Sequence, residues 1–291
     1  MDDEVRSERR PTMELLHPVG TPPRAVVVVA HGLNQRAHAL LPLSELLRRR
    51  GATIVLIRFR GHHWGSEHSP DTMDAWRSLG WRDWLRDWEE ASAVGASLAA
   101  RHEVPLVFLG FSLGALVHAY AMACRDDEPP PFARQLLLAP AIRVRPRSRA
   151  VLLFAALGRR FLVPSIAPAA VRSHSGTSVA AYSALFHLES SLDTPRHPER
   201  LRVPTLVLID PADELASPGR LRRWIERQGL TSHWQVRGVP RAAAPGARTF
   251  RHYVTDETAL GAASFGELAE LAVAALLGPP PAPGAPPEGS G

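Results

Sequence analysis

The chain of 291 residues is long enough for one large α/β domain, or for one domain that carries an insertion. Apolar residues make up 45% of it, which is enough for a packed core and excludes wholesale disorder. The formal net charge is +5, and all 34 basic residues are arginines, so lysine is excluded as a catalytic amine. These arginines are interleaved with acids, a pattern that indicates a solvated surface and not a nucleic-acid-binding stripe.

The single cysteine, Cys124, excludes an internal disulfide and a cysteine metal cluster, and it fits a reducing compartment. The first residues, MDDEVRSERRP, are charged and lack the apolar segment of a signal peptide. No uninterrupted apolar run approaches the roughly 20 residues needed to cross a bilayer. We therefore expect a cytoplasmic protein without stable membrane insertion. These features do not determine its oligomeric state.

Short apolar runs alternate with helical stretches along the chain. The first run, AVVVVAHGL, has no polar alternation and is typical of a strand buried on both faces. The alternation predicts an α/β fold with a mostly parallel, doubly wound sheet. The predicted strands lie within residues 25–33, 52–59, 105–110, 134–142, 204–210 and 233–239. Helices are expected over about 40–50, 74–101, 113–124 and 265–277, with Trp81, Trp84 and Trp88 forming a core-facing stripe on the second.

The alternation stops between the fourth and fifth predicted strands. Residues 143–202 are too long for an ordinary connection, so we interpret them as an inserted helical cap. The α/β core would then comprise residues 24–142 and 203–277, preceded by an N-terminal extension over residues 1–23. The Pro- and Gly-rich tail, residues 278–291, cannot form a core and is expected to be disordered.

The sequence GFSLG, residues 110–114, has the form G-x-S-x-G where a predicted strand gives way to a helix. A sharp turn at this point lifts Ser112 clear of the sheet, and the glycines on either side permit close packing. The following helix directs its amino end toward the serine, which favours negative charge there. A helix-capping serine in a glycine-rich turn is the structural alternative.

A serine nucleophile needs a histidine base, and the histidine needs a carboxylate to orient it. Downstream of Ser112, the segment PTLVLIDPADE offers two acids. Asp213 lies on the loop beyond the strand and is preferred, and Asp210, at the end of the strand, is the reserve candidate. His252 precedes the last helix and is preferred over His233, which opens a predicted strand.

The segment HGLNQR follows the first predicted strand. We expect the backbone N–H groups of Leu33 in this segment and of Leu113, just after the serine, to form an oxyanion hole. Two such donors can each supply about 3 kcal/mol of transition-state stabilisation. His31 itself is interpreted as a structural residue.

The motifs AHGL, RGHHWGS, GFSLG, PTLVLIDPADE and RHYVTDETALG occur in this order, and the chain thereby resembles the α/β-hydrolase superfamily. The nearest members are the carboxylesterases and monoacylglycerol-lipase-like enzymes, and the resemblance covers roughly residues 24–277. It implies the fold, the Ser112–Asp213–His252 triad and the two oxyanion amides. Many relatives have two further N-terminal strands, for which the region before Ala25 barely leaves room.

The segment RGHHWGS also departs from its relatives, which often have G-H-G there. We therefore expect His63 and Trp64, together with Phe186 from the cap, to border the substrate pocket. His62 and His63 also suggest a metal pair, but adjacent histidines on a turn rarely bind one ion and no carboxylate cluster accompanies them. No metal and no cofactor is predicted.

The leading hypothesis is hydrolysis of a carboxylic ester with a small or medium apolar acyl group through an acyl-enzyme. The enzymatic alternative is acyl transfer, or thioester or amide hydrolysis, on the same triad. Some members of the fold, the dehalogenases, use an aspartate nucleophile, and Ser112 argues against that chemistry. A non-catalytic binding protein of the same fold would be expected to have a broken triad. The predicted partner is a small ester molecule and not a nucleic acid.

Overall fold

A computed structural model describes residues 7–9, 12–18, 22–65, 70–165, 167–239, 250–255 and 257–278. The expected disordered tail beyond Gly278 lies outside these residues.

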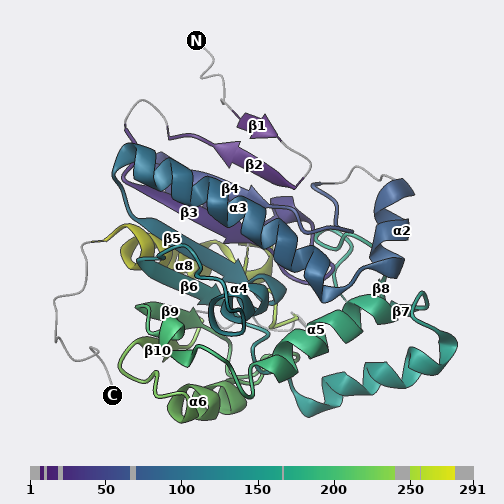
Figure 1. The fold of residues 1–291 in the computed structure, drawn as a ribbon. Helices are drawn as coiled ribbons and strands as arrows, with labels where there is room; N and C mark the ends of the chain where they lie inside the picture. The colour runs from purple at the N-terminus through teal and green to yellow at the C-terminus, as the bar shows by residue number, and fades with distance from the viewer. Residues whose placement is uncertain are drawn as a thin grey trace.

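The core of the protein is an eight-stranded sheet in the order β1-β2-β4-β3-β5-β6-β9-β10 (Figure 1). All neighbouring strands from β4 to β10 run parallel. Each of the six predicted strands is present: β3 (Ala25–Ala30), β4 (Ala52–Ile57), β5 (Leu106–Phe111), β6 (Arg134–Leu138), β9 (Thr205–Leu208) and β10 (Trp234–Arg237). The α/β fold class with a mostly parallel sheet is therefore confirmed.

Two strands extend the sheet before residue 24, where the core was expected to begin. The strand β2 (Met13–Leu16) pairs antiparallel with β4, and β1 (Ser7–Arg9) pairs antiparallel with β2. The short N-terminal region thus accommodates both strands. All four residues of β2 are buried, although Glu14 stands among them. A run of four residues that contains a carboxylate is too short and too polar to be recognised as a buried strand from its sequence.

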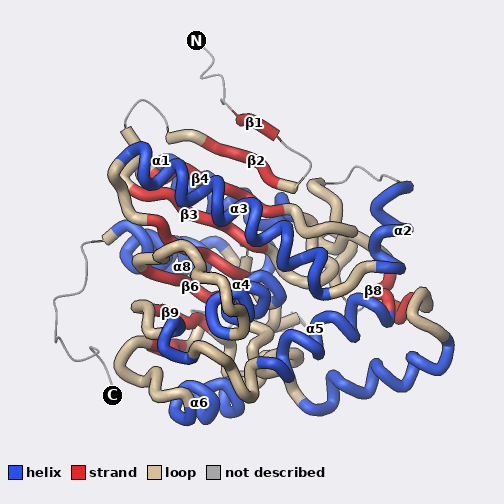
Figure 2. The backbone as a smooth tube through the Cα atoms, viewed as in Figure 1, coloured by secondary structure: helices blue, strands red, loops and turns tan. Residues whose placement is uncertain are grey.

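Helices cover both faces of the sheet (Figure 2). The helices α1 (Leu41–Arg49) and α8 (Ala262–Leu277) pack on one face. The helices α3 (Trp81–His102), α4 (Leu113–Ala123) and α6 (Pro218–Arg227) pack on the other. The short elements η1 (Ala37–Leu40) and α7 (Glu257–Leu260) precede α1 and α8. Among the described residues, no helix is long and apolar enough to span a bilayer.

The helix expected over residues 74–101 is in fact two helices. Its first part belongs to α2 (Pro70–Ser78). Gly80 is the N-cap of α3, and the Asp83 carboxylate accepts the Gly80 amide there. Trp84 and Trp88 are buried in the core, as the stripe predicted. Trp81 is only half-buried and stacks on His187.

The segment between β6 and β9 contains η2 (Pro146–Leu157), β7 (Leu162–Pro164), β8 (Gly176–Ser178), α5 (Val179–Ser191) and η3 (Pro198–Leu201). The helix α5 packs against α2, α3 and α4, and Figure 1 shows this segment beside one end of the strands. Residues 151–157 of η2 are apolar, yet Leu153 is 81% exposed and Leu157 is 61% exposed, so these two side chains face solvent. Apolar composition alone did not reveal which face of η2 is covered.

Three histidines are fully buried among the described residues: His31, His62 and His118. Burial strips water from a charged imidazolium and so lowers the pKa of His31 to about 4 and that of His118 to about 3. Burial also lowers the pKa of His62 well below its usual value, and the nearby His31 adds to that shift. All three rings are therefore neutral at neutral pH.

We predict that replacing His118 makes the protein less sensitive to acid. Unfolded His118 takes up a proton near pH 6.5, whereas folded His118 does so only near pH 3. Between these values the unfolded state binds more protons, so the free energy of unfolding falls as pH falls. The free energy of unfolding of wild type should therefore decline more steeply than that of His118→Gln, by about 1.4 kcal/mol per pH unit.

Urea titrations at several pH values between about 7.5 and 4.5 measure this difference. His102→Gln, at an exposed position, is the matched control and should leave the wild-type slope unchanged. Equal slopes for wild type and His118→Gln would contradict the prediction. Asp87, whose pKa burial raises to about 6, acts in the opposite direction, but it is common to all three proteins.

Candidate active site

Ser112 occupies the turn between β5 and α4. Its backbone has a φ of 49° and a ψ of −105°, a strained conformation for a residue with a side chain. Close packing around the turn requires both glycines of the motif. A Cβ on Gly110 would lie 2.8 Å from the Ala115 nitrogen, and one on Gly114 would lie 2.3 Å from the Ala30 oxygen. The sequence GFSLG thus folds into the sharp strand-to-helix turn that its spacing predicts.

A chain of hydrogen bonds joins Ser112 to His252 and Asp213. The His252 Nε2 atom lies 2.9 Å from the Ser112 Oγ atom, and its Nδ1 atom lies 2.8 Å from the Asp213 Oδ2 atom. The other carboxylate oxygen of Asp213 accepts the amides of Leu215 and Ala216, each at 2.8 Å. Asp213 therefore presents a single oxygen to the imidazole, which places a proton on Nδ1 and leaves Nε2 free to accept the serine proton.

The structure separates the two acids and the two histidines that the sequence offered. Asp210 binds the Ala212 amide and lies 3.5 Å from an Arg251 nitrogen, whereas Asp213 contacts His252. His233 lies at the opposite end of its strand from the site, where its carbonyl accepts the amide of Thr205 at the start of β9. The sequence-predicted residues Ser112, Asp213 and His252 are thus the ones that meet.

Glu214 is a site residue that the sequence reasoning missed. Its two carboxylate oxygens accept the backbone amides of Arg251 and His252, at 3.0 and 3.1 Å. It thereby fixes the loop that carries His252 to the loop that carries Asp213. The signal was present in the sequence as the acid directly after Asp213, but a backbone contact between loops 38 residues apart has no sequence pattern of its own.

Residues 31–36, which we call the oxyanion loop after the donor role predicted for Leu33 from the sequence, lie beside the turn at Ser112. The His31 carbonyl accepts the Gly114 amide at 3.0 Å, which joins the loop to the start of α4. The amides of Gly32, Asn34 and Gln35 all donate to atoms of the protein. The Leu33 N–H has no intramolecular partner within the part of the chain that the structure describes.

The Leu113 N–H is likewise without a partner among the described residues. It stands at the amino end of α4, directly after Ser112. Both amides that the sequence proposed as oxyanion donors are therefore available to a ligand.

Two buried histidines, one in each loop, join the oxyanion loop to the loop after β4. The His62 Nε2 atom accepts the Asn34 amide at 3.1 Å, and the His31 Nε2 atom accepts the Phe59 amide at 3.2 Å. Both bonds require an unprotonated Nε2, which the lowered pKa values of these two buried rings provide.

The three residues expected to border the pocket have other contacts. His63 is buried against Thr72 and His174, and Trp64 packs on His38 and under the Arg58 guanidinium. Phe186 is buried in α5 beneath the Arg149 guanidinium. His63 and Trp64 are thus packed within the loop after β4 and its neighbours, and Phe186 is packed within α5 and its neighbours. No group of three potential metal ligands occurs among the described residues.

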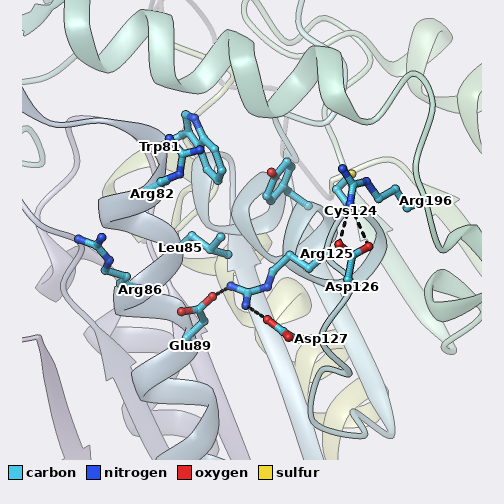
Figure 3. Close-up of a pocket in the computed structure, with 11 residues that line it drawn as sticks. Trp81, Arg82, Leu85, Arg86, Glu89, Cys124, Arg125, Asp126, Asp127 and Arg196 are labelled. Atoms are coloured by element: carbon cyan, nitrogen blue, oxygen red, sulfur yellow. Dashed lines mark hydrogen bonds and ion pairs between the residues drawn. The ribbon is translucent and has the colours of Figure 1, made fainter.

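A separate hollow lies between α3 and the end of α4 (Figure 3). Most of its charged groups form ion pairs, since Arg125 pairs with Glu89 and Asp127, and Arg196 pairs with Asp126, while Arg82 and Arg86 also line it. Burial raises the pKa of the Cys124 thiol at its edge to about 11, which makes the thiolate scarce. The hollow contains none of the residues around Ser112 and offers no comparable chemistry.

The sheet, the strand-to-helix turn and the inserted helices define an α/β hydrolase. Residues 21–184, more than half of the chain, match the family described as serine aminopeptidase, S33, and the chain belongs to that family. None of the curated proteins matches it.

Several solved structures share the fold at low sequence identity. A soluble variant of monoglyceride lipase from Saccharomyces cerevisiae has a TM-score of 0.69 at 15% identity, over 92% of this chain and 93% of the other. A structure from a study of two metagenome-derived lipolytic enzymes, LipS and LipT, has a TM-score of 0.65 at 18% identity, over 92% and 98%. The thioesterase domain from the curacin biosynthetic pathway has a TM-score of 0.52 at 15% identity, over 91% and 97%. At these identities the likeness shows that the fold is shared.

We predict that Gly114→Ala destabilises the protein by about 1–3 kcal/mol or more, because the added Cβ would press on the Ala30 backbone. The matched control is Gly266→Ala in α8, where a Cβ would meet nothing within 4 Å. That change should instead stabilise the helix by up to about 1 kcal/mol. Thermal and urea unfolding of both variants test the prediction. Equal stability of the two variants would show that the turn tolerates a side chain.

Proposed function

We propose that the protein hydrolyses carboxylic esters through an acyl-enzyme formed on Ser112, with His252 as the base and Asp213 as its orienting carboxylate. The observation that carries the proposal is the continuous chain from the Ser112 Oγ atom through His252 to Asp213, with bonds of 2.9 and 2.8 Å. A serine hydroxyl becomes a competent nucleophile when a neutral imidazole can take its proton.

The reaction follows from these contacts. The Ser112 Oγ atom attacks the ester carbonyl carbon while its proton moves to the His252 Nε2 atom. The carbonyl oxygen becomes an oxyanion and accepts the N–H groups of Leu33 and Leu113. The carbon–oxygen bond to the alcohol then breaks, and His252 returns the proton to the departing alkoxide. Water repeats the sequence on the acyl-enzyme and releases the carboxylic acid and free Ser112.

The cap is the part of the chain that we propose selects the substrate. We assign it residues 143–202 and infer an ester with a small or medium apolar acyl group. Support comes from the apolar side chains of α5 that pack toward the core, with Phe186 among them. Because His63 and Trp64 are packed within their own loop, they would affect this pocket only by fixing the position of that loop. Burial of each acyl methylene would contribute about 0.8 kcal/mol.

Thioester hydrolysis on the same triad is the second candidate. The structural likeness to the thioesterase domain from the curacin pathway favours this second candidate. The same nucleophile, base and oxyanion donors would serve it, because only the leaving group differs. Comparison of matched oxygen and thiol esters of one acyl group distinguishes the two activities.

We predict that Ser112→Ala abolishes the turnover of p-nitrophenyl esters and the covalent labelling by a fluorophosphonate probe. The thermal stability should stay near wild type, since the side chain is small. A series of esters with apolar and with charged acyl groups, assayed on wild type, tests the acyl preference in the same experiment. Near-normal hydrolysis by Ser112→Ala would exclude Ser112 as the nucleophile.

We predict that Asp213→Asn lowers kcat by about 10⁴-fold, because the amide favours the wrong imidazole tautomer. Asp210→Asn should have a much smaller effect, since Asp210 bonds the Ala212 amide and faces Arg251. Steady-state kinetics of the two variants make the comparison. The reverse order of effects would assign the orienting role to Asp210.

A further inference from the structure

Two adjacent side chains in the oxyanion loop bind two different parts of the molecule. Asn34 bonds to the cap, and Gln35 bonds to the loop that carries His252. Both are buried, with Asn34 3% and Gln35 0% exposed. Neither contacts Ser112, His252 or Asp213 in the hydrogen bonds of the described residues. They lie directly after Leu33, whose N–H has no hydrogen-bond partner among the described residues.

Asn34 joins the oxyanion loop to the cap by three hydrogen bonds. Its Oδ1 atom accepts the His174 amide at 2.8 Å, and its Nδ2 atom donates to the His174 carbonyl at 3.0 Å. Its own carbonyl accepts the Ser173 amide at 2.9 Å. The backbone of Asn34 has a φ of 53°, in the left-handed region that asparagine and glycine tolerate best. The side chain therefore fixes both a backbone conformation and a cap contact.

Gln35 closes the oxyanion loop from the other side. Its Oε1 atom accepts the Gly32 amide at 2.9 Å, and its Nε2 atom donates to the Thr255 hydroxyl at 3.2 Å. Thr255 is 0% exposed and follows His252 by three residues. One buried amide thus connects the loop that would stabilise the oxyanion with the loop that carries the base.

These contacts act on the backbone on both sides of Leu33. The amides of Gly32, Asn34 and Gln35 are held by the protein, and only the Leu33 N–H between them is free within the described residues. A donor fixed in this way pays no reorganisation cost when charge develops on the substrate oxygen. A mobile donor would lose that advantage mainly in the transition state, where the oxygen carries the charge.

We propose that Asn34 and Gln35 are positioning residues that hold the Leu33 N–H toward the reacting oxygen, Asn34 by anchoring the loop to His174 and Gln35 by anchoring it to Gly32 and Thr255. The proposal rests on the proposed serine-hydrolase function. It also makes the cap a structural support of the oxyanion hole, in addition to its part in substrate selection.

The test compares three variants of the full chain with wild type. Gln35→Met keeps the length of the side chain and removes both hydrogen bonds. Asn34→Gly keeps the left-handed backbone accessible and removes the two side-chain bonds to His174. The matched control is Gln135→Met, the same change at a buried glutamine in β6, at the opposite end of the strands from Ser112.

The measurements are kcat and KM for one p-nitrophenyl ester, the rate for the matching thionoester, and thermal unfolding. Sulfur is larger than oxygen and accepts hydrogen bonds more weakly, so a well-placed donor discriminates against the thionoester. Gln35→Met and Asn34→Gly should lower kcat by about tenfold or more, with KM within about threefold of wild type. Their preference for the oxygen ester should shrink. Gln135→Met should keep the wild-type kcat and preference.

A double-mutant cycle checks the route through Thr255. If Gln35 acts partly through that hydroxyl, then Gln35→Met combined with Thr255→Val should lower kcat by less than the product of the two single effects. Multiplicative effects would remove Thr255 from the proposal.

The positioning role is overturned if Gln35→Met and Asn34→Gly keep the wild-type kcat. It is equally overturned if their kcat falls while the preference for the oxygen ester stays at its wild-type value, because the loss would then come from general damage. If Gln35→Met does not fold, Asn34→Gly decides by the same criteria. These outcomes differ from failure of the proposed function, in which wild type itself would resist fluorophosphonate labelling at Ser112.

Discussion

The close contact between the end of β3 and the start of α4 is the constraint on which the site depends. The His31 carbonyl accepts the Gly114 amide at 3.0 Å, and the approach is possible only because Gly114 has no Cβ. This contact places the oxyanion loop next to the turn that presents Ser112. It also follows from the sheet order, since β3 and β5 are parallel neighbours and their carboxyl ends meet at one edge. The pairing of β3 with β5 and the close packing at Gly114 thus bring together the amides of Leu33 and Leu113, which have no partner among the described residues.

Two neutral histidine rings and one fully hydrogen-bonded carboxylate set the electrostatic environment of this edge of the sheet. Burial keeps His31 and His62 unprotonated, so each can accept a backbone amide and neither places a positive charge beside the oxyanion loop. Asp213 is 0% exposed, but two backbone amides and His252 satisfy its oxygens. A buried carboxylate with these partners is held in place against the imidazole and would stabilise the imidazolium that forms on His252 during the proposed reaction.

The segment that we propose as the cap is bonded to both loops of the site. At its beginning, the Arg145 side chain donates to the Asp213 carbonyl at 2.6 Å, and the Arg145 amide bonds to the Leu215 carbonyl. Further along, Ser173 and His174 bond to Asn34. The exposed helix η2 lies between these anchors. The segment is therefore anchored to the site at two places with the exposed η2 between them, which is consistent with an insertion that supports the site.

The sequence by itself determined the elements whose signal is local. Long apolar runs gave the six parallel strands, and the G-x-S-x-G spacing placed Ser112 at a turn, because strand burial and a glycine-flanked turn each require particular residues at short range. The sequence also ranked Asp213 and His252 as partners by their order along the chain. Only the tertiary structure brought those side chains within hydrogen-bond distance of Ser112. Tertiary structure alone also decided that β2 joins the sheet, that Leu153 and Leu157 face solvent, and that Asn34, Gln35 and Glu214 connect the loops of the site. The physical reason is that these contacts join residues far apart in the chain, and such a contact depends on where both segments have packed.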